Sequence, residues 1–395
     1  MNRKKIFLWG LYTFANSIVF VNFLVYFSKW LVMDGGLSDM AYNLVFVAVA
    51  VLLLFSAPSL SAHADKCGNR TILLNIASVG TILAYLAAAL AALWGAPVVL
   101  AFLFLIAAQY FFQMSYIFYD PLLNDLSDKE HRGSASGIGQ FCSASGMIFG
   151  LAASLPLVSA GGRLAPLIPS IVAFTILALP MMLLYREDCA VRQKEKIRLG
   201  FDWKKFRAFI LTSAAAPILI AFFFYTNALN TITNNYSIYA GQVLSITDET
   251  TSVIMIVVQI AAALGALAIG FVGDRIGIRR CLFGILWTWL LLIPMIASSS
   301  QMWVFFVLAG ILGLTIGAGW SASRAYISTN LEDGQVGYGF SFYTIFDRFS
   351  CMVGPVIWGG VLASGAGYRA AMLSMAFFVA MGIIILFLGT RKKLK

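Results

Sequence analysis

The sequence predicts an all-α polytopic membrane protein with twelve transmembrane helices in two six-helix halves. Its 395 residues are 61% hydrophobic and only 11% charged, which is too little charge to cover the surface of a soluble protein of this length. Apolar runs of about 20 residues, enough to cross roughly 30 Å of hydrocarbon, recur along the chain. These runs lack an alternation of period two, so we predict helices and exclude barrel strands. A short polar motif occurs once in each half.

Glycine, proline and charged residues interrupt the apolar runs and define the expected helices. The first run is too long for a signal peptide and has no small-residue cleavage site, so we expect it to be retained. The charged segment 186–205 is the expected linker between an N-terminal half, 1–185, and a C-terminal half, 206–395. The expected spans are 6–32, 40–62, 71–93, 97–124, 133–159, 164–185, 206–232, 249–272, 280–299, 302–329, 337–364 and 368–390.

The basic residues predict the orientation of these spans. With the N-terminus in the cytoplasm, 22 of the 27 Lys and Arg residues fall in cytoplasmic segments, two fall outside and three lie within spans. Because cytoplasmic loops of membrane proteins are enriched in Lys and Arg, we expect both termini and the linker to be cytoplasmic. We expect a monomer in the bacterial inner membrane. The net charge of +10 then requires no nucleic-acid partner, and the expected partners are the lipid bilayer and a small-molecule substrate.

The repeated motif indicates an internal duplication. One copy reads G-F-V-G-D-R-I-G-I-R-R from Gly270 to Arg280, and the other reads S-A-H-A-D-K-C-G-N-R from Ser61 to Arg70. Both copies fall on expected cytoplasmic loops, where their acidic and basic residues are candidates for a clasp that closes this side in one state. The alternative is ordinary solvated loop charge. With a related loop after span four, the expected gating residues are Asp65, Lys66, Gly68, Arg70, Asp125, Arg132, Gly270, Asp274, Arg275, Gly277, Arg279 and Arg280.

Polar residues inside the spans are the candidate substrate-binding or coupling residues. An ionisable side chain in a membrane helix costs about 2.5–3.5 kcal/mol on insertion scales, which makes Asp347 and Arg348 functional candidates. Their alternative role is a structural ion pair. Amides suit a neutral or zwitterionic solute, or they hold helices together by hydrogen bonds. The amide candidates are Asn16 on span one, Gln113 on span four, and Asn227 and Asn230 on span seven. We expect Lys29, near the end of span one, to reach the membrane interface.

Enzymatic, metal and ATP-driven chemistry are not expected. His63 and His131 lie at loop ends without a neighbouring nucleophile or metal set, and the five cysteines are scattered along the chain. The sequence has no G-x-x-x-x-G-K-[ST] loop for nucleotide binding. We therefore expect no cofactor.

These features together resemble the major facilitator superfamily over the whole chain. The segment L-Y-T-F-A-N-S, from Leu11 to Ser17, is similar to the Y-D-W/F-A-N-S opening of its vacuole-effluxer-like family, the relatives of autophagy-linked vacuolar amino-acid exporters. Similar matches lie at 224–232, 317–324 and 343–355. The resemblance implies a fold of two six-helix halves, with spans one and seven along a central cavity. Thr13 and Asn227 stand where that family has acidic residues.

The resulting hypothesis is a secondary transporter that works by alternating access. Within it, amino-acid efflux stands beside export of a siderophore, a drug or a lipid. Proton coupling, for which Asp347 is the main candidate, stands beside facilitated diffusion. A non-transporting membrane receptor on the same fold is the alternative from another functional class.

Overall fold

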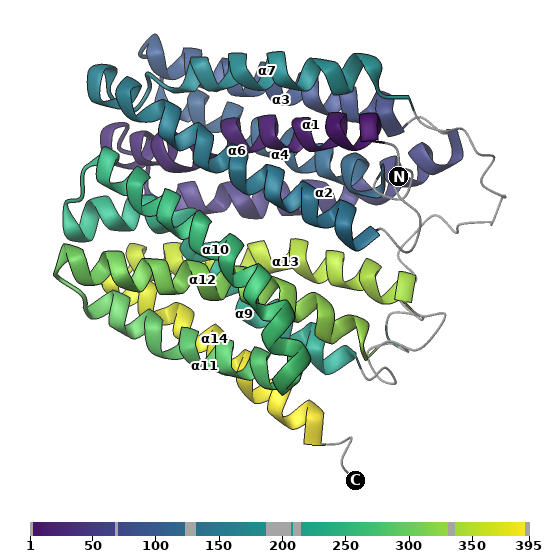
Figure 1. Cartoon of the computed structure of the whole chain (residues 1–395). Coiled ribbons are helices and arrows are strands. Elements are labelled where there is room, and N and C mark those ends of the chain that lie inside the picture. Colours follow the sequence, from purple (N-terminus) through teal and green to yellow (C-terminus); the bar gives the residue numbers. More distant parts are fainter. Residues whose placement is uncertain are drawn as a thin grey trace. The chain divides into compact units, whose positions relative to one another are not determined.

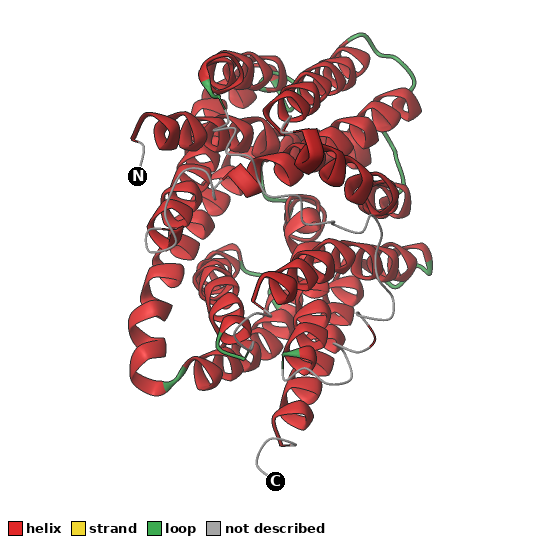
Figure 2. Cartoon of the chain, turned by 90° about the vertical axis from the view of Figure 1, so that its right-hand side faces the viewer, coloured by secondary structure: helices red, strands yellow, loops and turns green. Residues whose placement is uncertain are grey.

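Helices make up all the regular structure in the described part of the chain (Figure 2). The computed structural model describes residues 3–67, 70–122, 132–186, 207, 215–330 and 336–391, and none of these ranges contains a strand. The α-helices are α1 (Arg3–Asn22), α2 (Asp39–Cys67), α3 (Arg70–Leu93), α4 (Val98–Tyr119), α6 (Arg132–Gly161), α7 (Leu167–Leu184), α9 (Ala216–Leu244), α10 (Asp248–Ile276), α11 (Ile278–Ser298), α12 (Met302–Ser328), α13 (Val336–Ala363) and α14 (Gly367–Arg391).

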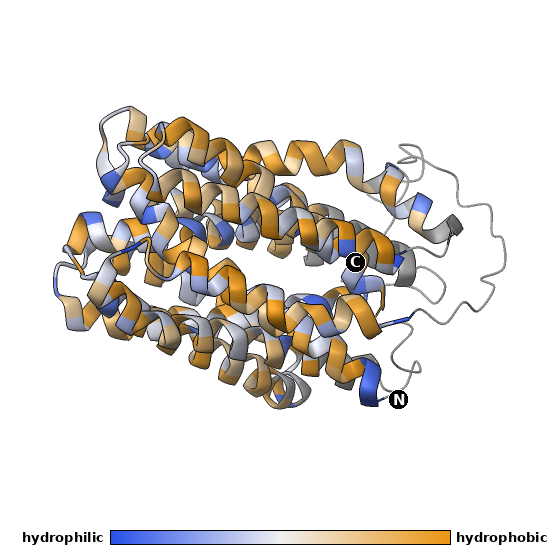
Figure 3. Cartoon of the chain, turned by 90° about the horizontal axis from the view of Figure 1, so that it is seen from above, coloured by the Kyte–Doolittle hydropathy of each residue, from blue (hydrophilic) through white to orange (hydrophobic). Residues whose placement is uncertain are grey.

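Eleven helical stretches in the described ranges are long and apolar enough to cross a membrane. α13 adds a shorter apolar stretch, Phe349–Ala363. Apolar residues cover most of each helix, and the most hydrophilic residues gather near the helix ends (Figure 3). The expectation of an all-helical integral membrane protein is confirmed.

The seventh helix departs most from its expected bounds. It was expected at 206–232, but α9 runs from Ala216 to Leu244 and so includes Asn234 and Asn235. Asn235 is wholly buried and donates a hydrogen bond to the carbonyl oxygen of Thr231 at 2.9 Å. Because a satisfied amide is tolerated inside a helix bundle, these asparagines do not end the helix.

The first span contains two π-helical segments. α1 continues into η1 (Phe23–Phe27) and η2 (Trp30–Asp34), so the whole stretch from Arg3 to Asp34 forms one long span. π-Helical turns are rare and are often found at functional sites. Lys29 lies between the two segments and is wholly buried at 0% exposure. The expectation that its ammonium group reaches the interface is therefore wrong.

Contacts within the chain group it into two compact units. Unit 1 comprises Met1–Leu37 and Ala48–Phe201, and unit 2 comprises Ser38–Val47 and Asp202–Lys395. Each unit is described separately below.

In unit 1, α1 packs against α6 and α7, and the three helices run side by side (Figure 1). Gly146 of α6 lies so close to the carbonyl group of Phe14 that no Cβ would fit, and a Cβ on Gly150 would lie 3.1 Å from the Cα of Ile18. Such small residues let two membrane helices approach closely. This packing places most of α1 in the interior of the protein.

In unit 2, α9 packs against α13 and α14, and α10 packs along α12. The second pair is again brought together by glycines. Gly265 of α10 lies against the carbonyl oxygen of Leu314, and Gly317 of α12 lies against that of Ala262, in both cases too close for a Cβ. Close contact of this kind supplies the van der Waals attraction that holds helices together in lipid.

The start of α2 also belongs to unit 2 through its contacts. Asn43 and Asn235 exchange two hydrogen bonds between their amide groups, at 3.0 and 2.8 Å. The hydroxyl of Tyr42 donates to the carbonyl oxygen of Asn234 at 3.0 Å, and the hydroxyl of Tyr368 donates to the carboxylate of Asp39 at 2.8 Å. The first turns of α2 are thus attached by polar side chains to α9 and α14.

Candidate functional site

The amide of Asn16 is the least satisfied polar group on α1. Asn16 is 0% exposed, and neither its Oδ1 nor its Nδ2 has a hydrogen-bond partner in the structure. Leaving a buried donor or acceptor unpaired costs about 1–3 kcal/mol per group. Asn16 lies 13 residues after Arg3, which places it about 20 Å along a span of 32 residues. The unpaired amide is therefore near the middle of this candidate membrane span.

Aromatic rings from α1 and α4 lie next to this amide. Tyr12 and Phe20 are one turn away on either side of Asn16, on the same helix face. The ring of Phe20 stacks on Phe112 with centroids 4.8 Å apart, and the ring of Tyr12 stacks on Tyr119 at 5.3 Å. This aromatic cluster was not among the expected site residues, although the i, i+4 spacing of Tyr12, Asn16 and Phe20 was a signal for it.

Two other buried polar side chains of α1, those of Asn22 and Tyr12, are satisfied. Asn22, which is also 0% exposed, donates to the carbonyl oxygen of Ile18 at 2.9 Å and accepts from the hydroxyl of Ser154 at 2.6 Å. The hydroxyls of Tyr12 and Ser78 are 2.7 Å apart. Asn16 therefore differs from Tyr12 and Asn22, two buried polar residues of the same helix whose side chains are paired.

The amides of α9 attach it to α13. Oδ1 of Asn227 accepts from the backbone N–H of Gly354 at 2.9 Å, and its Nδ2 donates to the carbonyl oxygen of Phe223 at 2.8 Å. Nδ2 of Asn230 donates to the hydroxyl of Ser350 at 3.0 Å. The structure thus brings Asn227 and Asn230 together with the Gly354-Pro355 segment, in contacts that connect two helices.

The structure describes fewer contacts for the remaining candidate substrate-binding residues. Asp347 is half-buried on α13, and its charge and that of Arg324 both act on the Tyr343 hydroxyl. Arg348 is part of α13, but its side chain lies outside the described residues. Gln113 is half-buried on α4 and has an interaction partner.

The second copy of the repeated motif forms the junction between α10 and α11. Gly277 separates the two helices with φ of +89°, a value that residues with a Cβ rarely adopt. Arg275 and Arg280 are exposed, and the guanidinium of Arg279 lies 5.9 Å from the ring centroid of Phe283. Gly270 and Asp274 are in α10, but the side chain of Asp274 is not described.

The first copy and the related loop lie largely outside the described residues. Asp65 and Lys66 fall in the last turn of α2 and Arg132 begins α6, but their side chains are not described. Gly68 and Asp125 are outside the described ranges altogether. Arg70 begins α3 and has an interaction partner. The clasp expected from these residues stays a prediction.

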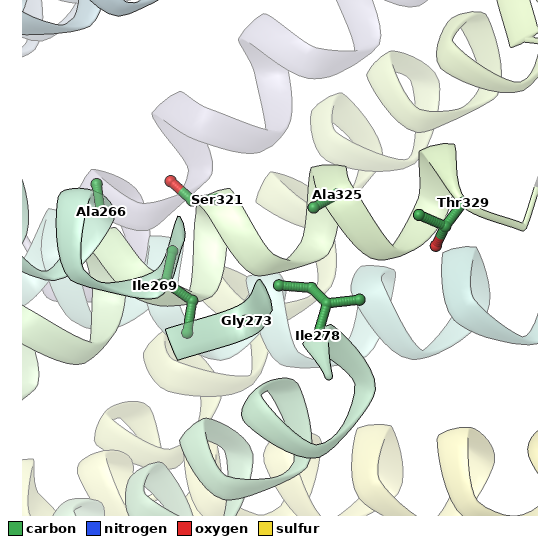
Figure 4. A pocket seen from close by; sticks show the side chains of 7 residues that line it. All are labelled: Ala266, Ile269, Gly273, Ile278, Ser321, Ala325 and Thr329. Atoms are coloured by element: carbon green, nitrogen blue, oxygen red, sulfur yellow. The ribbon is translucent and has the colours of Figure 1, made fainter. Parts of the chain in front are cut away.

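A cavity of about 450 Å³ lies beside the second motif copy. Six residues of α10, α11 and α12, together with Thr329 directly after α12, line it (Figure 4): Ala266, Ile269, Gly273, Ile278, Ser321, Ala325 and Thr329. Apart from two hydroxyls the lining is apolar, and it contains none of the predicted substrate-binding side chains. In the described part of the chain, no group of three His, Cys, Asp or Glu residues is placed to hold a metal ion.

Comparison with known proteins agrees with this architecture. The profile described as "Major Facilitator Superfamily" matches residues 9–247 and 218–395. An "Uncharacterized MFS-type transporter YxiO" of Bacillus subtilis is 23% identical over 406 residues, covering 96% of this chain and 93% of the relative. The crystal structure of the nucleoside transporter NupG shares the fold with a TM-score of 0.76 at 15% identity, covering 99% of each chain.

The finer resemblance is supported over only part of the chain. Autophagy-related protein 22 of Coccidioides immitis is 24% identical over 176 residues, which is 41% of this chain and 29% of that protein. The profile match, by contrast, extends over almost the entire sequence. This chain is an integral membrane secondary transporter, not an enzyme, and belongs to the Major Facilitator Superfamily.

Proposed function

We propose that this transporter moves a small, neutral or zwitterionic polar solute by alternating access, and that Asn16 contacts the solute. The unpaired, fully buried amide of Asn16 carries the proposal. A polar group without a partner in the membrane interior is expected to have a function there. A solute that pairs with the amide removes the cost of leaving it unsatisfied. Gln113, Asn227 and Asn230 are further candidate contacts, although both amides of α9 already have partners.

The test of this function is binding followed by exchange. Purified protein is screened by thermal shift against amino acids, nucleosides, siderophores, drugs and lipids, and each hit is then tested for counterflow in proteoliposomes. We expect a polar solute to stabilise the protein and to exchange across the membrane. Nucleosides are included because NupG, which shares the fold, is a nucleoside transporter. A solute that binds without counterflow would favour a receptor instead.

We further propose that Asp347 couples transport to protons, with Arg348 as its neighbour in the chain. Asp347 is the half-buried carboxylate of α13, and it acts on Tyr343 together with Arg324. A carboxylate inside the membrane can carry a proton by changing its charge. We expect Asp347→Asn to abolish uptake driven by a pH gradient while leaving counterflow intact. Unchanged proton dependence would contradict the coupling role and would leave facilitated diffusion.

The motif loops are proposed to hold the cytoplasmic side closed in one state. The left-handed Gly277 and the exposed Arg275 and Arg280 support a sharp, charged junction at the second copy. We expect Asp274→Asn to slow transport several-fold without a matching loss of folded protein. A fall in folded yield with an unchanged rate per molecule would instead indicate a structural role.

The proposed location is a bacterial inner membrane, with a monomeric protein whose termini and linker are cytoplasmic. The uneven distribution of Lys and Arg over the loops supports this orientation. A reporter enzyme that is active only in the cytoplasm, fused after Lys395, should be active. The same reporter inserted at Gly162, in the α6–α7 loop, should be inactive.

A further inference from the structure

Asn16 carries an acceptor and a donor that are both buried and unpaired. Its Oδ1 and Nδ2 lie in one plane on the same side-chain group, and neither has a partner. A ligand that pairs with both atoms needs a hydrogen-bond donor next to a hydrogen-bond acceptor in the same plane. Asparagine pairs in this two-bonded way with the edge of adenine in protein–DNA complexes. Lactam and carboxamide edges offer the same pattern.

The surroundings of this amide suit a flat and uncharged ligand. Residues 6–28 of the first span and residues 98–119 of α4 contain no Asp, Glu, Lys or Arg. They supply instead the rings of Phe20 and Phe112 one turn to one side of Asn16, and those of Tyr12 and Tyr119 one turn to the other. Tyr116 lies between these pairs, 5.3 Å from Phe112 and 5.9 Å from Tyr119. Faces and edges of aromatic rings favour aromatic ligands.

We propose that Asn16 recognises a planar heterocycle with adjacent hydrogen-bond donor and acceptor groups, of the nucleobase class. The inference rests on the proposed function and narrows its substrate class. Both hydrogen bonds go to Asn16, and the aromatic rings of α1 and α4 favour a flat ring over an aliphatic solute. A formal charge on the ligand would lack a counter-charge in these two stretches of helix, so the ligand is neutral.

The experiment compares four probes on the purified full-length protein by calorimetry: uracil, adenine, 1,3-dimethyluracil and leucine. Dimethyluracil keeps the ring and the carbonyl acceptors of uracil but has no N–H donor. Because a site built on hydrogen bonds rejects ligands that lack them, we expect dimethyluracil to bind at least tenfold more weakly than uracil. Leucine should not bind. Equal affinity for uracil and dimethyluracil, or no binding of either base, would overturn the proposal.

Two matched substitutions locate the site on α1. Asn16→Leu should lose binding of uracil and adenine while its melting temperature stays equal or rises. Asn22→Leu removes an equally buried amide that already has two partners, so it should lower the melting temperature and keep base affinity. If that variant does not fold, Ser154→Ala removes one of the same hydrogen bonds and serves as the control. Base affinity that survives Asn16→Leu would also overturn the proposal.

The outcomes separate this inference from the proposed function. Transport of a non-planar solute that is lost in Asn16→Leu would leave Asn16 as a substrate contact and refute only the heterocycle. Transport that is unaffected by Asn16→Leu would refute both roles of this residue.

Discussion

One helix of each unit, α1 in unit 1 and α9 in unit 2, carries a buried asparagine, and the two amides differ in their pairing. Asn16 of α1 is buried with both amide groups unpaired, whereas Asn227 of α9 is buried with both groups paired. Both residues follow a tyrosine whose hydroxyl contacts a serine hydroxyl, at 2.7 Å in Tyr12–Ser78 and at 2.6 Å in Tyr225–Ser323. Both helices thus have a hydroxyl contact between a tyrosine and a serine. They differ in whether their buried amide is paired.

This difference teaches that an amide in a membrane helix has no fixed role. In α13, which packs beside α9, Pro355 interrupts the series of backbone hydrogen bonds. The backbone N–H of Gly354 donates a hydrogen bond to Oδ1 of Asn227 on α9. On α1, no such backbone group is offered to Asn16 by the described residues. One amide is therefore part of the helix interface, and the other is available to a ligand.

The largest effect is expected from Asn227→Leu. The substitution removes the acceptor of the Gly354 N–H and leaves that donor buried and unpaired, so the free energy of unfolding should fall by about 1–3 kcal/mol. Unfolding in a denaturing detergent measures the change. Thr233→Leu, at an exposed position of the same helix, is the control and should be close to neutral. An unchanged stability of Asn227→Leu would remove the proposed contrast with α1.

The opposite sign is expected from Asn16→Leu. Replacing an unpaired amide by an apolar side chain of similar size removes a desolvation cost, so the free energy of unfolding should rise by about 1 kcal/mol. The same unfolding assay without ligand measures it, with Asn22→Leu as the paired-amide control on the same helix. If Asn16→Leu destabilises as much as Asn22→Leu, then Asn16 has a structural partner after all.

A smaller effect is expected for the amide pair that attaches α2 to α9. Hydrogen bonds between membrane helices average about 0.6 kcal/mol in double-mutant cycles, with a maximum near 1.7 kcal/mol. The cycle formed by Asn43→Ala, Asn235→Ala and the double variant should give a coupling energy in this range, because the pair exchanges two bonds. A coupling energy of zero would mean that the pair adds nothing to the attachment of α2.

The smallest effect is expected at the end of the first span. Arg163 donates to both carboxylate oxygens of Asp34, at 2.7 and 2.8 Å, but the two side chains are 21% and 46% exposed. Exposed pairs contribute roughly 0–1 kcal/mol and are screened by salt. Arg163→Gln should therefore change the free energy of unfolding by less than Asn43→Ala does. At high salt, the effect of Arg163→Gln should vanish. A larger loss of stability that does not depend on salt would show that the Arg163–Asp34 ion pair stabilises the protein as much as the buried amides do.

Much of the fold could be predicted because a membrane constrains composition so strongly. Apolar runs of spanning length can only be helices, so the helices themselves were recognisable. The end of α9 was not, because the expected span stopped at 232, and only the partners of Asn234 and Asn235 show how these polar residues fit inside the helix. Lys29 was misjudged for a related reason: long basic side chains usually reach the interface, and only packing shows that this one is wholly buried.

The candidate site could be predicted only as a set of polar residues. Asn16, Asn227 and Asn230 were all chosen by the same argument, and nothing in the chain distinguished them. Their hydrogen bonds do so, because Asn227 and Asn230 pair with α13 while Asn16 pairs with nothing. Asp347 was visible as a charge in an apolar run, but its proximity to Tyr343 depends on the helical fold of α13.

By itself, the sequence determined that this protein lies in a membrane and that it is helical. These properties follow from the transfer free energy of side chains, which is summed along the chain and needs no partner. The tertiary structure alone decided which polar groups are satisfied, that Lys29 is buried, and that the start of α2 belongs with α9. These properties depend on pairs of groups far apart in sequence, and a hydrogen bond exists only when both partners are in place.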